Sequence, residues 1–165
     1  MNVKLKALVI DDSGVMRKMV MKSLTDANLG QFEFVEAEDG RDGLAKLAAN
    51  EVHIGFVDWN MPNMTGIEFV REVRKLEKEK GQEGIPLVMV TSEKTIAKIE
   101  EALDQAGADT FITKPFTVAE LSAKLKKAVS KAELVCLSRR RQQREEQQTA
   151  AQPAAQGGFF SKLFG

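Results

Sequence analysis

The fold of this chain is decided by one stretch, which reads Val57-Asp58-Trp59-Asn60-Met61-Pro62-Asn63-Met64-Thr65-Gly66. It continues a short apolar run that begins at residue 53, and the run ends on the carboxylate of Asp58. Pro62 and Gly66 then break the pattern and indicate a turn. An apolar run of this length, bounded by chain breakers, is typical of a buried strand. The pattern therefore places Asp58 at the carboxyl end of a strand, and in open α/β sheets that edge is where ligands bind.

Strand and helix patterns alternate along the chain on both sides of this stretch. Such alternation predicts a parallel sheet covered by helices on both faces and joined by right-handed crossovers. For five strands and five helices we expect the doubly wound α/β order 2-1-3-4-5. The expected strands are residues 5–10, 32–35, 53–58, 87–90 and 110–113, and the apolar helical faces are expected within residues 15–24, 44–48, 67–76, 96–103 and 118–132.

Three carboxylates are expected at one edge of this sheet. Asp11 and Asp12 end the first strand, and the expected order puts that strand beside the one that ends at Asp58. Carboxylates this close repel one another, so protons or a cation must relieve the repulsion. Mg²⁺ suits such a cluster, because it binds through a few carboxylates and keeps water and phosphate oxygens as further ligands. The sequence therefore predicts a magnesium site at this edge.

The same edge carries the other groups that phosphoryl transfer needs. A carboxylate can accept a phosphoryl group as an acyl phosphate, and we expect Asp58 to do so. The reaction depends on positioning and on positive charge beside the transferred oxygens. Lys114, at the end of the fifth strand, can supply part of this charge, and Thr91, at the end of the fourth, offers a hydroxyl donor.

Together these motifs resemble the receiver domains of response regulators, and especially the CheY-like single-domain regulators of the chemotaxis type. The resemblance covers roughly residues 1–130 and is carried by Asp11-Asp12, Asp58, Thr91-Ser92, Lys114-Pro115-Phe116 and the stretch 58–64. It implies that Asp58 accepts phosphate from a histidine kinase. It also implies that Asp12, Asp58 and the backbone carbonyl of Asn60 ligate Mg²⁺ with help from Asp11. Lys114 would contact the phosphate, next to a Lys-Pro bond that is often cis in this family.

The resemblance further implies a switch that changes protein binding. Thr91 would move toward the phosphate while the ring of Phe111 turns inward, which remodels the face of the fourth helix, fifth strand and fifth helix. Phe111 stands where CheY-like members have tyrosine, so it can switch by burial without a hydroxyl group. A flagellar motor component or a phosphatase is the implied kind of downstream partner. We expect a phosphoacceptor with self-catalysed phosphotransfer and dephosphorylation, and not a separate enzyme.

Composition argues against several other classes of protein. The chain has 24 basic and 24 acidic residues, a balance that does not suggest binding to nucleic acid or membrane. Cys136 is the only cysteine, so no intrachain disulfide can form and a cytoplasmic location is favoured. One histidine and one cysteine argue against structural zinc. A flavin-binding protein of the same layer order is disfavoured, because Asp11-Asp12 would repel the flavin phosphate.

Three side chains outside the predicted site have simple structural interpretations. Val15 is expected on the inner face of the first helix, because it belongs to the helical apolar pattern. Trp59 is expected at the surface beside the site, where its fluorescence could report metal or phosphate. His53 stands at the start of a strand and is expected at an edge or in solvent.

The chain divides into three parts by composition. We expect a receiver domain over residues 1–132, a helical extension with a flexible Gln/Ala-rich linker over 133–158, and a Phe-rich peptide over 159–165. The linker itself is expected over 147–156. About 30 residues are too few for a DNA-binding output domain.

The Phe-rich peptide carries four large apolar side chains in seven residues. Phe159, Phe160, Leu163 and Phe164 would share one helical face, which predicts docking into a groove of a partner. Membrane contact is a weaker alternative, since the segment is short and has one lysine, and an incidental terminus without a binding role is the third. The arginines at 139–141 and 144 resemble tails of CheY-like proteins that bind cyclic di-GMP, but a solvated helix end explains them as well.

Two other functions stay open at this point. A phosphorelay intermediate or phosphate sink would use the same Asp58, with transfer as its output. A scaffold that works independently of phosphorylation would act through residues 159–165.

Overall fold

A computed structural model describes residues 3–92 and 95–151 of the chain, and within them all five expected strands and all five expected helices are present. The strands are β1 Lys4–Ile10, β2 Gln31–Ala37, β3 Ile54–Asp58, β4 Leu87–Thr91 and β5 Thr110–Thr113. The helices are α1 Gly14–Asp26, α2 Gly40–Ala49, α3 Gly66–Glu79, α4 Ile96–Glu100 with the π-helical segment η1 Glu101–Gln105, and α5 Val118–Ala151.

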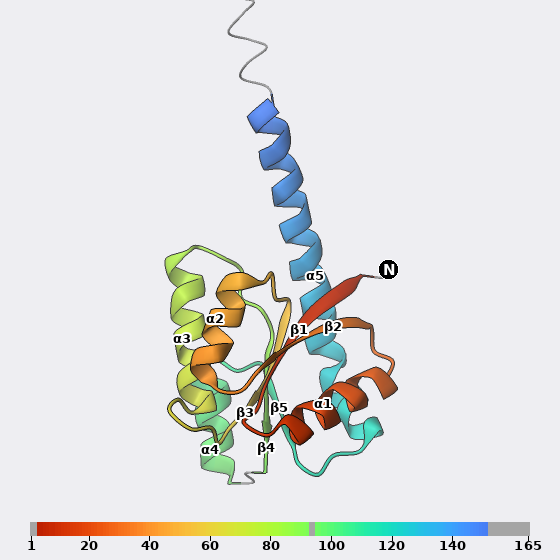
Figure 1. The fold of residues 1–165 in the computed structure, drawn as a ribbon, viewed down its shortest axis with the longest axis vertical. Coiled ribbons are helices and arrows are strands. Elements are labelled where there is room, and N and C mark those ends of the chain that lie inside the picture. The colour runs from red at the N-terminus through yellow and green to blue at the C-terminus, as the bar shows by residue number, and fades with distance from the viewer. Residues whose placement is uncertain (1–2, 93–94, 152–165) are drawn as a thin grey trace, which may run out of the picture.

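The strands form one parallel sheet in the order β2-β1-β3-β4-β5, which confirms the predicted doubly wound topology. Helices α1 and α5 cover one face, and α2, α3 and α4 cover the other (Figure 1). In the register of β1 and β3, Ile10 lies opposite Val57. The residues that follow both strands therefore emerge side by side at the carboxyl edge of the sheet.

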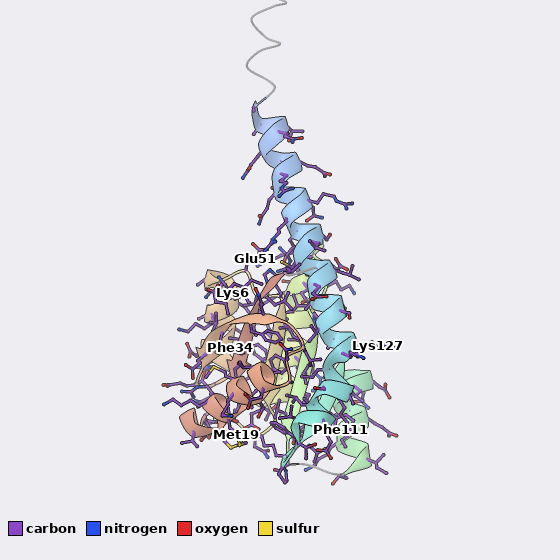
Figure 2. All side chains as sticks on the ribbon, turned by 90° about the vertical axis from the view of Figure 1, so that its right-hand side faces the viewer. Lys6, Met19, Phe34, Glu51, Phe111 and Lys127 are labelled. Carbon is purple, nitrogen blue, oxygen red and sulfur yellow. The ribbon has the colours of Figure 1, made fainter. Side chains whose placement is uncertain are left out.

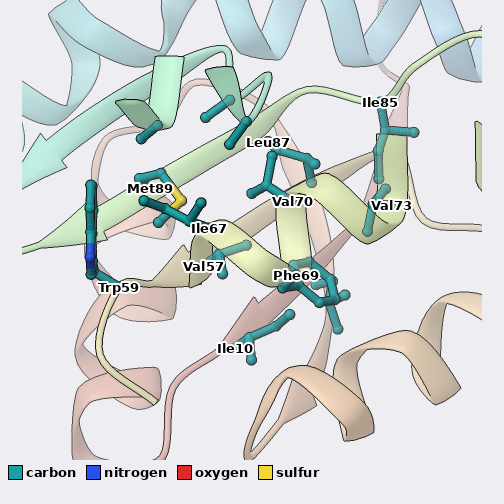
Figure 3. Packing of buried hydrophobic residues seen from close by; sticks show 14 of the residues in the cluster. Ile10, Val57, Trp59, Ile67, Phe69, Val70, Val73, Ile85, Leu87 and Met89 are labelled. Carbon is teal, nitrogen blue, oxygen red and sulfur yellow. The ribbon is translucent and has the colours of Figure 1, made fainter. Parts of the chain in front are cut away.

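The sheet separates two apolar layers, and neighbouring residues of a strand enter opposite layers. In β1, Leu8 and Ile10 pack toward α3, whereas Ala7 and Val9 pack toward α1 and α5. Figure 3 shows the first layer, in which Phe69 of α3 lies close to Ile10. Strands that are buried on both faces have continuous apolar sequences, which explains why their runs were recognisable.

Three single-residue expectations were wrong. Trp59 is buried, with 8% of its surface exposed, and lies in the layer with Ile67 and Met89 (Figure 3). His53 is also buried, and its Nδ1 accepts a hydrogen bond of 2.9 Å from the backbone N–H of Lys6, because β3 is an inner strand. Val15 is 77% exposed. The spacing of apolar residues identifies one face of a helix. It does not show which residues of that face, such as Val15 in the first turn of α1, lie beyond the part that is covered by other elements.

The predicted fourth helix changes type along its length. After α4 the chain continues as η1. At its end, the amide of Ala106 donates a hydrogen bond of 2.9 Å to the carbonyl of Glu101, five residues earlier. Gly107 then adopts a left-handed conformation with φ of 89°, which glycine tolerates and which ends the segment.

Helix α5 has 34 residues and is therefore about 51 Å long, so its final turns project beyond the sheet (Figure 1). It is preceded by a capping box, in which the Glu120 amide donates to Thr117 Oγ1 and the Thr117 amide donates to the Glu120 carboxylate. Residues 147–151 are helical, whereas we had expected them in the linker. The boundary at residue 132 falls inside this helix and stays a prediction. Of the described helices, none is both long and apolar enough to cross a membrane.

Candidate functional site

The three predicted carboxylates come together at the carboxyl edge of the sheet. Asp11 and Asp12 follow β1, and Asp58 is the last residue of β3, the strand beside it. One carboxylate oxygen from each lies within 4.8 Å of the other two. Asp11 is buried and Asp12 is exposed, so the cluster opens to solvent on one side.

Lys114 joins two of these carboxylates. Its Nζ lies 3.2 Å from Asp58 Oδ1 and 3.3 Å from Asp11 Oδ2. The lysine follows β5, and its backbone N–H donates 2.7 Å to the carbonyl of Thr91 at the end of β4. The Lys114–Pro115 peptide bond is cis, as the family resemblance suggested. One ammonium among three carboxylates leaves two negative charges in this group of four side chains.

The environment of Asp58 disfavours its charged form. Burial raises the pKa of this carboxyl above its ordinary value, the Lys114 ammonium lowers it, and the Asp11 carboxylate raises it again. The net direction is upward. Asp58 thus gains from additional positive charge, which is what a divalent cation would supply. Three hard oxygen donors close together also match the ligand preference of Mg²⁺.

A second set of contacts positions the Asp11-Asp12 turn, and the sequence analysis missed it. The side chain of Arg17 donates 2.7 Å to the backbone carbonyl of Asp11 and 3.0 Å to the carboxylate of Glu36 on β2. The amide of Ser13 donates 2.9 Å to Asp11 Oδ1, while the Ser13 hydroxyl caps α1 by accepting from the Met16 amide. The serine cap was predictable from the sequence. The role of Arg17 was not, because it depends on β2 lying beside β1.

The loop from Asp58 to α3 is closed by the backbone. The amide of Gly66 donates 3.0 Å to the carbonyl of Trp59, and Thr65 with Glu68 forms a capping box at the start of α3. Asn60 is exposed in this loop, two residues after Asp58. Its role as a carbonyl ligand stays a prediction.

The two predicted switch residues lie on neighbouring strands. Thr91 is completely buried at the end of β4, opposite Thr113 in the register of β5. Phe111 is half-buried at the β5 edge of the sheet. The ammonium of Lys124, from α5, lies 4.0 Å from the centroid of the Phe111 ring. No sequence pattern pointed to this contact, since Lys124 reads as an ordinary solvent residue of an amphipathic helix.

A pocket of about 390 Å³ lies beside these residues, and Lys114 contributes to both the pocket and the acidic cluster. Its lining comes from α4, β5, the loop after β5 and α5, namely Ile99, Ile112, Thr113, Lys114, Pro115, Phe116, Glu120 and Lys124. Ile96 of α4 is 72% exposed. The acidic edge is therefore physically continuous with the helical face that was expected to switch.

The peptide residues Phe159, Phe160, Leu163 and Phe164 lie outside the described part of the chain. Their docking role stays a prediction.

Comparison with known proteins places most of the chain in one family. The family described as the response regulator receiver domain matches residues 7–126. A chemotaxis protein CheY homolog of Campylobacter jejuni is 42% identical over 123 residues, which cover 74% of this chain and 90% of that protein. Chemotaxis protein CheY1 of Helicobacter pylori is 39% identical over 123 residues, covering 74% and 94%. The structure of chemotaxis response regulator CheY4 of Vibrio cholerae has a TM-score of 0.65 at 35% identity and covers 76% of this chain and 99% of its own.

Proposed function

Because the chain belongs to the family of response regulator receiver domains, and is a CheY-like response regulator of phosphorylation-based signalling, we propose that Asp58 is its phosphoacceptor and that Mg²⁺ assists the transfer. The observation that carries the proposal is the position of Lys114, whose ammonium lies 3.2 Å from one oxygen of Asp58. A cation placed there can neutralise charge on a phosphoryl group bound to the same carboxylate.

The transfer step uses the ionised carboxylate of Asp58 as nucleophile. Its oxygen attacks the phosphorus of a phosphohistidine on a histidine kinase, the new O–P bond forms, and the P–N bond breaks. The electron pair of the broken P–N bond stays on the imidazole nitrogen of the kinase histidine, which takes up a proton from solvent. Lys114 balances charge on the transferred oxygens, and Arg17 holds the Asp11 backbone in place. Asp11, Asp12 and Asp58, with the carbonyl of Asn60, would hold Mg²⁺, which supplies the remaining positive charge when it is bound.

The output is a change in the face formed by α4, β5 and α5. We infer that Thr91 contributes its hydroxyl to the new phosphoryl group and that Phe111 turns inward from the edge of β5. Lys124 would then lose its ring contact, which alters both the shape and the charge of the pocket beside it. A downstream protein such as a flagellar motor component or a phosphatase would bind this face. The similarity to chemotaxis regulators favours such an output over a phosphate sink or a phosphorylation-independent scaffold.

The test uses the full chain, Mg²⁺ and a small-molecule phosphodonor, with Trp59 fluorescence as the optical readout. Trp59 directly follows Asp58 and is the only tryptophan, so we expect a saturable change on phosphorylation. Mass spectrometry should find one phosphoryl group that hydroxylamine removes. Asp58→Asn should abolish both signals, whereas Asp26→Asn should keep them, because Asp26 is an exposed partner of Lys22 on α1. A phosphoryl group on Asp58→Asn would refute the assignment.

A further inference from the structure

The long helix α5 creates a groove at the end of the domain opposite Asp58. The groove has a volume of about 570 Å³, within the range of ligand pockets in general. We call it the extension groove, because residues Ser138–Glu146 of α5 contribute one of its walls. The opposite wall comes from the ends of α2 and α3 and the loops after them, and its apolar lining consists of Leu44, Leu47, Ala48, Val52, Val73, Leu76 and Ile85.

The α5 wall is fastened to the domain. Val135 and Cys136 are completely buried, and just beyond them Arg139 donates 2.9 Å to the carbonyl of Val52. One turn later Gln143 donates 3.1 Å to the carboxylate of Glu51, which Figure 2 labels where the helix leaves the domain. From Arg140 to Ala151 every residue is exposed. A polar helix end with so little packing of its own gains from anything that bridges it to α2 and α3.

We propose that residues 159–165 of the same chain bind in the extension groove. Four of these seven residues are the large apolar Phe159, Phe160, Leu163 and Phe164, and partly buried leucines such as Leu44 and Leu47 line the groove. Charge also matches. Four carboxylates and two cations line the groove, and because Glu77 is paired with Arg74 at 2.7 Å, one net negative charge is left to face the one lysine of the segment.

The chain is long enough to return. The groove wall ends at Glu146, five residues before Ala151, which is about 7.5 Å along a helix. The seven residues 152–158 can span up to about 25 Å when extended. This exceeds the roughly 20 Å of helix between Ser138 and Ala151, so the segment can reach any part of the groove. A link this short keeps the segment at about millimolar effective concentration near the groove, so the groove can be occupied even if the affinity of the segment for it is weak.

The extension groove is independent of the phosphorylation site. Val52 and Ile85 precede β3 and β4, so the groove lies at the amino edge of the sheet, while Asp58 lies at the carboxyl edge. Binding of residues 159–165 therefore leaves the face of α4, β5 and α5 open. The inference does not depend on the phosphoacceptor assignment, and occupancy should be the same with and without beryllofluoride.

Amide hydrogen exchange of the full chain tests the proposal. The comparison is between the natural chain and one in which Phe159, Phe160, Leu163 and Phe164 are all replaced by serine. Exchange is read over residues 44–52 and 76–85, which contain most of the residues of the wall opposite α5. If the segment is bound about two thirds of the time, exchange of the amides it covers should be about threefold slower in the natural chain.

Leu134→Ser is the matched control, because Leu134 is an apolar residue of α5 that is 66% exposed and does not line the groove. It should leave exchange over 44–52 and 76–85 unchanged. Equal exchange in the natural chain and the serine variant overturns the proposal. Protection that grows with protein concentration also overturns it, because the occupant is then the segment of a second copy.

Discussion

Gly66→Ala offers the sharpest check on how the Asp58 loop is built. Gly66 is the first residue of α3, and a methyl group on it would collide with the backbone carbonyl oxygen of Asp58. The same methyl would lie 2.7 Å from Met89 Cε and 3.1 Å from Trp59 Cα. Two of these three obstacles are backbone atoms, so no side-chain rotation can relieve the collision. Glycine is needed here for space, and not for an unusual backbone angle.

The magnitude follows from this geometry. Overpacking a well-packed site typically costs 1 to 3 kcal/mol, and a backbone collision belongs at the upper end, so we expect a loss of about 3 kcal/mol in the free energy of unfolding. With m-values of about 1 to 3 kcal/mol/M in urea, the midpoint should fall by about 1 to 3 M. To relieve the collision, the backbone must move at Asp58, and the carboxylate of the same residue moves with it. A misplacement near 1 Å should slow phosphorylation by up to about a hundredfold.

Urea unfolding followed by Trp59 fluorescence measures the first effect, and the rate of phosphorylation by a small phosphodonor measures the second. Gly30→Ala is the control, because a methyl group there would meet only Val129 and Phe32 at 3.8 and 4.0 Å. Its stability should change by no more than about 0.5 kcal/mol. If Gly66→Ala loses less than about 1 kcal/mol and keeps the normal rate, the proposed packing of the loop is wrong.

Three further predictions concern charge at the site and the switch. In metal-free buffer at pH 7, Asp58→Asn should raise the free energy of unfolding, because the pKa of Asp58 is raised by burial and its ionisation opposes folding. The gain should shrink as the pH falls through the raised folded pKa toward the unfolded value of 3.8, and it should vanish below 3.8, where both states hold the proton. A gain that is constant across a pH series of urea unfolding would contradict this. Mg²⁺ at about 100 times its Kd should stabilise the natural chain by about 2.7 kcal/mol in thermal unfolding. Asp12→Asn should lose most of this gain, and an equal gain in both chains would exclude Asp12 as a ligand. Lys124→Met removes a cation–π contact worth about 0.5 to 1 kcal/mol, so the inward population of Phe111 should rise about two- to fivefold in NMR spectra. Lys127→Met, an exposed neighbour on α5 (Figure 2), should have no such effect, and an equal rise in both would point to helix charge instead.

The fold could be predicted because its elements have distinct apolar periods. Residues 7–10 and 87–90 are continuous apolar runs, as inner parallel strands require, and the stretches predicted as helices repeat with helical spacing. Once the strand order followed from the alternation of elements, the meeting of Asp11, Asp12 and Asp58 followed from it. The order of β1 and β3 was the single step on which the acidic cluster depended.

The sequence by itself thus determined the doubly wound sheet, the acidic edge and the candidate roles of Thr91 and Lys114. Those features depend on chain order and on the chemistry of single residues. Only the tertiary structure decided that Trp59 is buried, that Arg17 holds the Asp11 backbone, and that α5 continues past the sheet to form a groove. Each of these depends on distances between elements that are far apart in sequence. Local periodicity says which face of an element is apolar, but not which atoms of another element lie against it.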